Sequence, residues 1–160
     1  MCTLPYQDIR SRCIVPPVVA HLCKPLVEPY AEQERSHGMT YGCGPCGYDV
    51  RIAQDLVTVP GKMVLASIIE KLNMPDDLEA NVCDKSTWAR RGLFVQNTQI
   101  EPGWFGFLTL EITSTEVIHL KYGMPIAQIV FRTLCNPTQF PYRGKYQNQA
   151  AEPQPALLEE

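Results

Sequence analysis

The residues best able to do chemistry are concentrated in one stretch, 84–111 (DKSTWARRGLFVQNTQIEPGWFGFLTLE). Hydroxyl and cationic side chains open it: Lys85, Ser86, Thr87, Arg90 and Arg91. Such groups, together with backbone N–H donors, can bind a polyphosphate. At the other end Glu111 follows Thr109 and Leu110 in a segment that reads as a strand. A carboxylate among apolar neighbours is paired or functional, and it can serve as a general base. The stretch therefore predicts hydrolytic chemistry, and the alternative for Glu111 is an exposed strand residue.

The elements that must position these groups are predicted to be β-strands. Residues 92–100 alternate and turn like a β-hairpin, and Pro102-Gly103 is a turn signal because Gly permits a positive φ. Residues 63–72 fit a helix by composition and a strand by alternation. Further strands are predicted at 48–52, 57–62, 109–112, 117–120 and 126–131. Strands that recur about every ten residues, with turns between them, are typical of an all-β barrel or sandwich.

The flanking segments are predicted to be short or irregular. They comprise a capped helix at 4–10, an extended segment at 14–19, a polar connection at 24–37, a loop at 39–49 and a helical turn at 74–78. The tail, 150–160, is rich in Pro and Glu, so we expect it to be disordered.

Composition narrows the classes of protein. The 160 residues are 45% hydrophobic, which is enough for one domain with a core. A net charge of −3 argues against a nucleic-acid partner, which needs a basic face. No apolar run approaches the roughly 18 residues of a membrane span, and the first residues have no apolar signal core. We therefore expect no membrane partner and a cytoplasmic location, which is the host cytoplasm if the chain is viral.

Seven cysteines are scattered through the chain except for the pair in Cys43-Gly44-Pro45-Cys46. A thioredoxin-like redox site needs a helix that opens at the second cysteine, but residues 47–51 are strand-like. A structural zinc half-site is also weak, because no second CxxC or His pair completes it. The favoured interpretation is a tight loop that carries two thiols, whose role the sequence leaves open.

A zinc-dependent deaminase is disfavoured as well. That class carries an H-x-E signature and a P-C-x-x-C signature. None of the three histidines, His21, His37 and His119, is followed two residues later by Glu, and Asp49 stands where the second cysteine would be.

Three motifs carry a resemblance to a known family: Lys85-Ser86-Thr87-x-Ala89-Arg90, Ile100-Glu101-Pro102-x-Trp104-x-Gly106 and Thr109-Leu110-Glu111. In this order and spacing they resemble the dCTP deaminase family, within the dCTP deaminase/trimeric dUTPase superfamily. The resemblance extends over about residues 4–149. It implies an all-β, distorted jelly-roll-like barrel with one or two short helices, in which 63–72 is a strand. It divides the chain into a domain at 1–149 and the tail at 150–160, and it implies a homotrimer with active sites between subunits.

The resemblance also implies the reaction, which is hydrolytic deamination of dCTP to dUTP and ammonia without a catalytic metal. Glu111 would be the general base, and Ser86 and Arg90 would place it and the attacking water. Magnesium would arrive on the triphosphate, and no zinc and no metal-ligating residue is expected.

Substrate contacts are expected from four regions. The triphosphate would be bound by Lys85, Ser86, Thr87 and Arg90. The pyrimidine edge would be read by backbone groups of the segment 95–100, which carries Thr98 and Ile100, and Glu101 would contact the sugar. Trp104 is expected either to wall the pocket or to pack in the core. Thr109 and the closing tail complete the set, with Tyr142, Lys145, Tyr146 and Gln149 in the tail.

Several points stay open at the level of sequence. Asp84 replaces the glycine usual in the family and adds negative charge near the phosphates, and Ala150-Ala151 replaces the usual continuation after Gln149. The alternatives are a bifunctional deaminase–diphosphatase that yields dUMP, a plain dUTPase, and a nucleotide-binding regulator without catalysis. Feedback inhibition by dTTP and a cellular or viral origin are not decided by the sequence.

Overall fold

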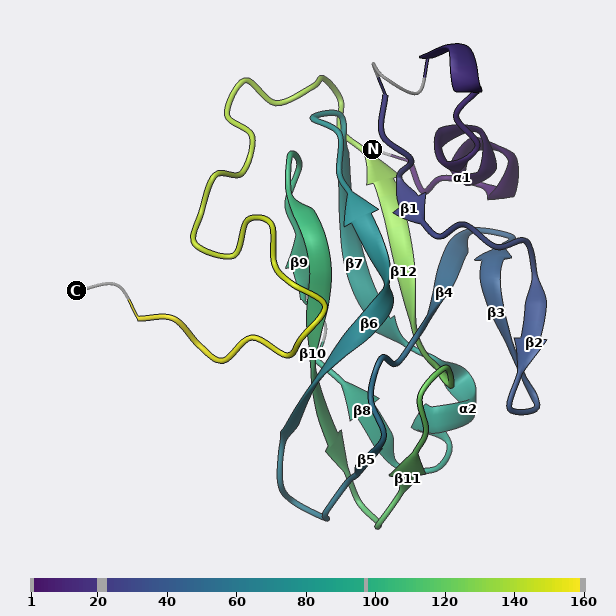
Figure 1. Ribbon diagram of the computed structural model, residues 1–160, viewed down its shortest axis with the longest axis vertical. Coiled ribbons are helices and arrows are strands. Elements are labelled where there is room, and N and C mark those ends of the chain that lie inside the picture. Colours follow the sequence, from purple (N-terminus) through teal and green to yellow (C-terminus); the bar gives the residue numbers. More distant parts are fainter. Residues whose placement is uncertain (1, 20–22, 97, 159–160) are drawn as a thin grey trace.

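Two β-sheets face each other in the computed structural model of the chain, which describes residues 2–19, 23–96 and 98–158 (Figure 1). The first sheet has the order β1-β6-β10-β8. Its strands are β1 (Val27–Glu28), β6 (Val64–Asn73), β10 (Phe105–Ser114) and β8 (Leu93–Val95). All of its pairings are antiparallel, so each strand can present one face to the core and one to solvent.

The second sheet has the order β2-β3-β4-β12-β7-β9. Its strands are β2 (Glu34–Ser36), β3 (Met39–Gly44), β4 (Gly47–Arg51), β12 (Pro125–Thr133), β7 (Leu78–Asp84) and β9 (Gln99–Ile100). A separate ribbon pairs β5 (Leu56–Val57) with β11 (His119–Leu120). The helices are α1 (Tyr6–Cys13), a 3-10 turn (Pro17–Val19) and α2 (Ser86–Ala89).

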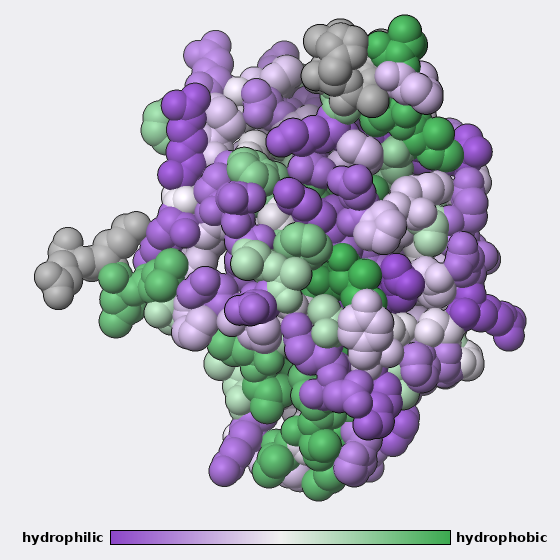
Figure 2. All heavy atoms as spheres, in the orientation of Figure 1, coloured by the Kyte–Doolittle hydropathy of each residue, from purple (hydrophilic) through white to green (hydrophobic). Residues whose placement is uncertain are grey.

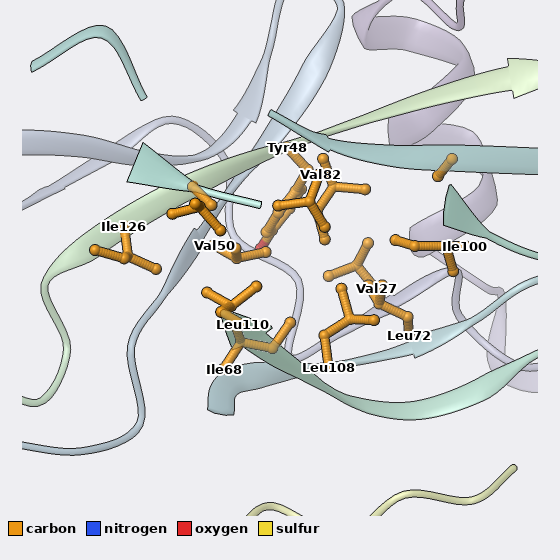
Figure 3. Close-up of a cluster of buried hydrophobic side chains, with 14 of the residues drawn as sticks. Val27, Tyr48, Val50, Ile68, Leu72, Val82, Ile100, Leu108, Leu110 and Ile126 are labelled. Carbon is orange, nitrogen blue, oxygen red and sulfur yellow. The ribbon is translucent and has the colours of Figure 1, made fainter. Parts of the chain in front are cut away.

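The hydrophobic core lies between the two sheets. Figure 3 shows Tyr48, Val50 and Val82 of the second sheet facing Ile68 and Leu110 of the first. Each of these five side chains is at most 1% exposed. Apolar burial of this kind contributes roughly 25 cal/mol per Å² removed from water, so the contact between the sheets is the main source of stability.

The predicted fold class is confirmed, since the structure is mostly β with short helices. Among the described residues the strand pairings leave two packed, open sheets rather than a closed barrel. The strand at 63–72 is present as β6, and the early helix is present as α1. No helix in the described part of the chain is long and apolar enough to cross a membrane.

Three local predictions were wrong in whole or in part. Residues 39–49 are not a loop, because β3 and β4 form a hairpin that turns at Pro45-Cys46. Residues 92–100 are not a hairpin, because β8 pairs with β10 while β9 pairs with β7 in the other sheet. The segment at 14–19 ends in the 3-10 turn instead of staying extended. Residues 74–78 form the predicted turn, in which Leu78 N–H donates to the Pro75 carbonyl at 3.4 Å. The error at 92–100 concerns strand partners distant in sequence, which a local pattern does not specify.

One buried ion pair joins the sheets. The Glu70 side chain is 0% exposed, and its carboxylate accepts from Arg51 Nε at 2.8 Å and from the Arg51 backbone N–H at 2.9 Å. Burial raises the pKa of Glu70, and the Arg51 contacts oppose that rise.

We expect Arg51→Met to destabilise the protein by about 3 kcal/mol near neutral pH, because the change leaves Glu70 buried without its cation. A group with a raised folded pKa loses its stabilising contribution as pH rises through that pKa, so the loss should be larger near pH 8 than near pH 5. Chemical denaturation at both pH values measures this. Arg35→Met is the matched control, since Arg35 is exposed and forms no ion pair within the described residues. Equal destabilisation by Arg51→Met at both pH values would contradict the role of Arg51 as the cation paired with buried Glu70.

Candidate active site

A pocket of about 350 Å³ opens on the solvent-facing side of β10. Its walls come from β10, the segment after β8, the start of β6 and the C-terminal segment. They consist of Met63, Leu65, Thr98, Gln99, Ile100, Glu101, Trp104, Leu108, Thr109, Glu111, Tyr142, Tyr146, Gln149, Gln154 and Ala156. A volume of this order suits a small organic ligand, and the mixed apolar and polar lining is typical of such sites.

Glu111 is positioned by the alternation of β10. Leu110 and Ile112 point into the core and are at most 1% exposed, so Glu111 between them must face outward into the pocket. The Glu111 carbonyl accepts the backbone N–H of Gln96 at 2.9 Å. Thr98 Oγ1 donates to Glu111 Oε2 at 3.3 Å. The carboxylate is therefore partly buried and held by a neutral donor rather than by a cation.

A β-bulge shapes the pocket floor. The register between β10 and β6 shifts between Phe107 and Thr109, where Leu108 alone stands opposite three residues of β6, 68–70, and Leu108 lies at the pocket. Bulges re-aim side chains and are common beside active sites. Ile100 and Trp104 complete an apolar floor and are 2% and 5% exposed. Trp104 thus both packs in the core and walls the pocket.

The C-terminal segment is docked against β10. Asn148 N–H donates to the Phe105 carbonyl at 2.9 Å, and Phe107 N–H donates to the Gln149 carbonyl at 3.0 Å. Gly106 has φ +143° between them, and a Cβ at that position would lie 2.7 Å from the Gln149 nitrogen. Glycine is therefore needed for the close approach of the two backbones. Figure 1 shows this yellow segment passing beside β10.

Three of the four expected tail residues reach the pocket. Tyr142, Tyr146 and Gln149 line it, whereas Lys145 does not and donates to the Leu157 carbonyl. Residues 150–158, expected to be a disordered tail, also run along the pocket. Gln154 and Ala156 form part of its wall, and the Gln154 N–H donates to Thr109 Oγ1 at 2.8 Å.

The residues of α2 lie elsewhere. Ser86, Thr87 and Arg90 are exposed, and none of them lines the pocket. Figure 1 shows α2 and the C-terminal segment on opposite sides of the chain. Lys85 is turned inward and donates to Asp49. The structure thus divides the expected site residues into those that line the pocket, such as Glu111, and those at α2, namely Ser86, Thr87 and Arg90. Among the described residues, the pocket lining contains no Lys or Arg.

Sequence reasoning missed several pocket residues. Met63 and Leu65 are ordinary strand residues by pattern, and Gln154 and Ala156 lie in a segment of low sequence complexity. No local signal marks them, because they reach the pocket only through the pairing of β6 with β10 and the return of the tail. Residue 97, inside the predicted base-reading segment, lies outside the described residues.

Fold and site together define a dUTPase-like β-protein with a ligand pocket built around a strand carboxylate. A dUTPase from phage phi11 of Staphylococcus aureus superposes with a TM-score of 0.55 at 16% identity, covering 76% of this chain and 95% of that one. The 2′-deoxycytidine 5′-triphosphate deaminase of Agrobacterium tumefaciens superposes with a TM-score of 0.62 at 19% identity, covering 82% of this chain and 48% of that one.

The chain belongs to the dCTP deaminase-like family, whose model matches residues 44–134. The dCTP deaminase of Thermococcus kodakarensis is 34% identical over 139 residues, which cover 76% of this chain and 84% of that protein. The dCTP deaminase of Campylobacter curvus is 30% identical and covers 84% of this chain and 91% of its own. The resemblance seen in the three motifs is therefore confirmed.

We expect Gly106→Ala to release the C-terminal segment from β10, because the added Cβ would overlap the Gln149 backbone. Hydrogen exchange of the Phe107 amide, which bonds the Gln149 carbonyl, should accelerate about tenfold or more. Gly38→Ala is the matched control, since Gly38 also has a positive φ but its Cβ would meet nothing within 4 Å. Equal protection of Phe107 in both variants would contradict the role of Gly106.

Proposed function

We propose that this protein deaminates dCTP hydrolytically, giving dUTP and ammonia. The observation that carries the proposal is the position of Glu111, the carboxylate of the family's Thr-Leu-Glu motif. It lies in a pocket whose other walls include the segment expected to read the pyrimidine, with Thr98 and Ile100, and the C-terminal segment. Family membership and relatives named dCTP deaminase support the same reaction.

The chemistry needs a base beside C4 of the cytosine ring. Glu111 accepts a proton from a water molecule, and the resulting hydroxide adds to C4. The amino nitrogen then takes up a proton and leaves as ammonia while the C4 carbonyl forms, so one water is consumed and one ammonia released. The Thr98 hydroxyl, 3.3 Å from Glu111 Oε2, fixes the carboxylate orientation from which the water is deprotonated.

The pocket of one chain supplies the base and sugar contacts. Thr98 and Ile100 would meet the pyrimidine, Glu101 the sugar, and Thr109 with Tyr142, Tyr146 and Gln149 the remainder of the nucleotide, and all of them line the pocket. Lys145 would reach the phosphates from the adjoining segment. Magnesium would be carried by the triphosphate, and we find no cluster of three or more His, Cys, Asp or Glu suited to a metal in the described parts of the chain.

The cationic half of the site would come from a second copy of the chain. A triphosphate needs positive charge, but the described pocket lining has none, and Ser86, Thr87 and Arg90 are exposed on the opposite side. A head-to-tail ring brings one face of each subunit to a different face of the next, which joins the two groups. We infer a homotrimer in which α2 of one subunit completes the pocket of its neighbour.

An apolar surface adds support for association. Figure 2 shows hydrophobic side chains gathered at the end of the molecule where β5 and β11 lie. Val57, Val59, Met63 and Val117 at this end are 44–57% exposed. Exposed apolar groups that cluster are typical of protein interfaces.

A second activity, diphosphate hydrolysis to dUMP, is the alternative, because Glu101 lines the same pocket as Glu111. Such a reaction would need Glu101 to direct water at the α-phosphorus. Glutamate is one methylene longer than the aspartate usual in dUTPases, and a displacement on the order of 1 Å costs about 10² in rate. We therefore propose that dUTP is the product that accumulates.

We expect Glu111→Gln to lower dCTP turnover by about 10² to 10⁴ while nucleotide binding is retained, since Gln keeps the shape but does not accept the proton. Steady-state ammonia release and equilibrium dialysis with dCTP measure the two quantities. Glu116→Gln is the control, as Glu116 is a surface carboxylate outside the pocket and should leave turnover unchanged. Near wild-type turnover in Glu111→Gln would remove Glu111 from the mechanism.

Mixed trimers test the shared site. Glu111→Gln and Arg90→Ala should each be inactive alone, yet random co-assembly in equal amounts should restore roughly a quarter of the wild-type activity, because that fraction of sites pairs an intact Glu111 with an intact Arg90. Arg90→Ala mixed with Ser86→Ala should restore nothing, since both changes affect the same half-site. No recovery in the first mixture would show that both residues act within one chain.

A further inference from the structure

The residues that precede and form α2 divide by the direction they face. Ser86, Thr87 and Arg90 are exposed and available to a ligand. Lys85 points the other way, and its ammonium group donates to Asp49 of β4. The Lys85 and Asp49 side chains are only 11% and 14% exposed, so this ion pair is largely shielded from solvent.

The Asp49 carboxylate is fixed on the sheet from a second side. Gln128 Nε2 donates to Asp49 Oδ1 at 3.1 Å, while Lys85 bonds Oδ2, so both oxygens have partners. Gln128 stands directly opposite Asp49 in the register of β12 and β4. Lys85 is therefore tied to the two central strands of the second sheet rather than to a mobile surface group.

Two other side chains near α2, the exposed Asp84 and the buried Trp88, are also hydrogen-bonded to strands. Asp84 Oδ1 accepts the backbone N–H of Val95 in β8 at 2.7 Å. Trp88 is 4% exposed, and its Nε1–H donates to the Pro125 carbonyl at the start of β12 at 2.7 Å. The short helix thus has three side-chain attachments, and Lys85 provides the one nearest Ser86.

Binding of Lys85 to a phosphate would break this arrangement. The ammonium would have to leave Asp49, and a carboxylate that is only 14% exposed would keep a single neutral donor from Gln128. Removing one partner of a shielded ion pair is far more costly than losing an exposed one, because the remaining charge stays desolvated. A triphosphate would therefore gain less from Lys85 than from the exposed Arg90.

We propose that Lys85 is a positioning residue that acts through Asp49, and not a ligand of the triphosphate. The ion pair holds the start of α2 on β4, so that Ser86 and Arg90 are presented in a fixed orientation. The inference rests on the proposed deaminase function and assigns a role within it. It also gives a role to Asp49 and to Gln128, which lie outside the three motifs of the stretch 84–111.

A double-mutant cycle of Lys85→Met and Asp49→Asn separates the two roles. If Lys85 acts through Asp49, each single change should lower kcat for dCTP by about tenfold with little change in KM, and the double variant should be no worse than the poorer single variant. If Lys85 binds phosphate, Lys85→Met should raise KM, Asp49→Asn should not, and the effects should add. The double variant, with no unpaired charge, also keeps the test usable if Lys85→Met folds poorly.

The exposed ion pair between Lys121 and Asp55 is the matched control. Its nitrogen and oxygen are 2.9 Å apart, both side chains are 58% exposed, and neither lines the pocket. Lys121→Met and Asp55→Asn should leave kcat and KM unchanged. Lys85→Arg should retain most of kcat, because a guanidinium can still reach Asp49.

The outcomes distinguish this inference from the function on which it rests. Wild-type protein that releases no ammonia from dCTP would overturn the proposed function, and the positioning role with it. An active wild type in which Lys85→Met raises KM with kcat intact, or in which the two changes add, would overturn the positioning role alone.

Discussion

The alternation of β10 is the constraint on which the rest of the site depends. The strand is hydrogen-bonded to β6 along most of its length and to β8 at its end, so its register is fixed on both sides. Leu110 and Ile112 are held in the core, and Glu111 between them has only the opposite face available. A slip of one residue would bury the carboxylate and expose two core residues, which makes the orientation of Glu111 a consequence of core packing.

The same strand organises the walls of the pocket. Leu108 lies at the pocket where the register with β6 shifts, and the free edge of β10 near Gly106 accepts the C-terminal segment as an added partner. By contrast, α2 is attached to the second sheet: Lys85 bonds Asp49, Trp88 bonds the Pro125 carbonyl, and the helix follows the end of β7. The pocket and the exposed residues of α2 are therefore held by different sheets, and the proposed ring of subunits would unite them.

Much of this could be predicted from the sequence, because short motifs encode local chemistry. The fold class, Glu111 and the three pocket residues of the tail, Tyr142, Tyr146 and Gln149, followed from motifs and strand spacing. The direction of Lys85 did not, because a cation beside Ser86 reads as a phosphate ligand unless Asp49, 36 positions earlier, is known to face it. The supposed hairpin at 92–100 failed for the same reason, since two sheets compete for its ends. Contacts between residues far apart in sequence decide these cases.

The most direct test of the central claim is the fate of oxygen from water. Purified protein is incubated with dCTP in ¹⁸O-labelled water, and the products are resolved by chromatography and mass spectrometry. Attack of a Glu111-activated water at C4 predicts one labelled oxygen in the uracil ring of dUTP, with the phosphates unlabelled and ammonia released in equal amount. Label in a phosphate group of dUMP or pyrophosphate, with the base unlabelled, would contradict the account and assign the pocket to diphosphate hydrolysis.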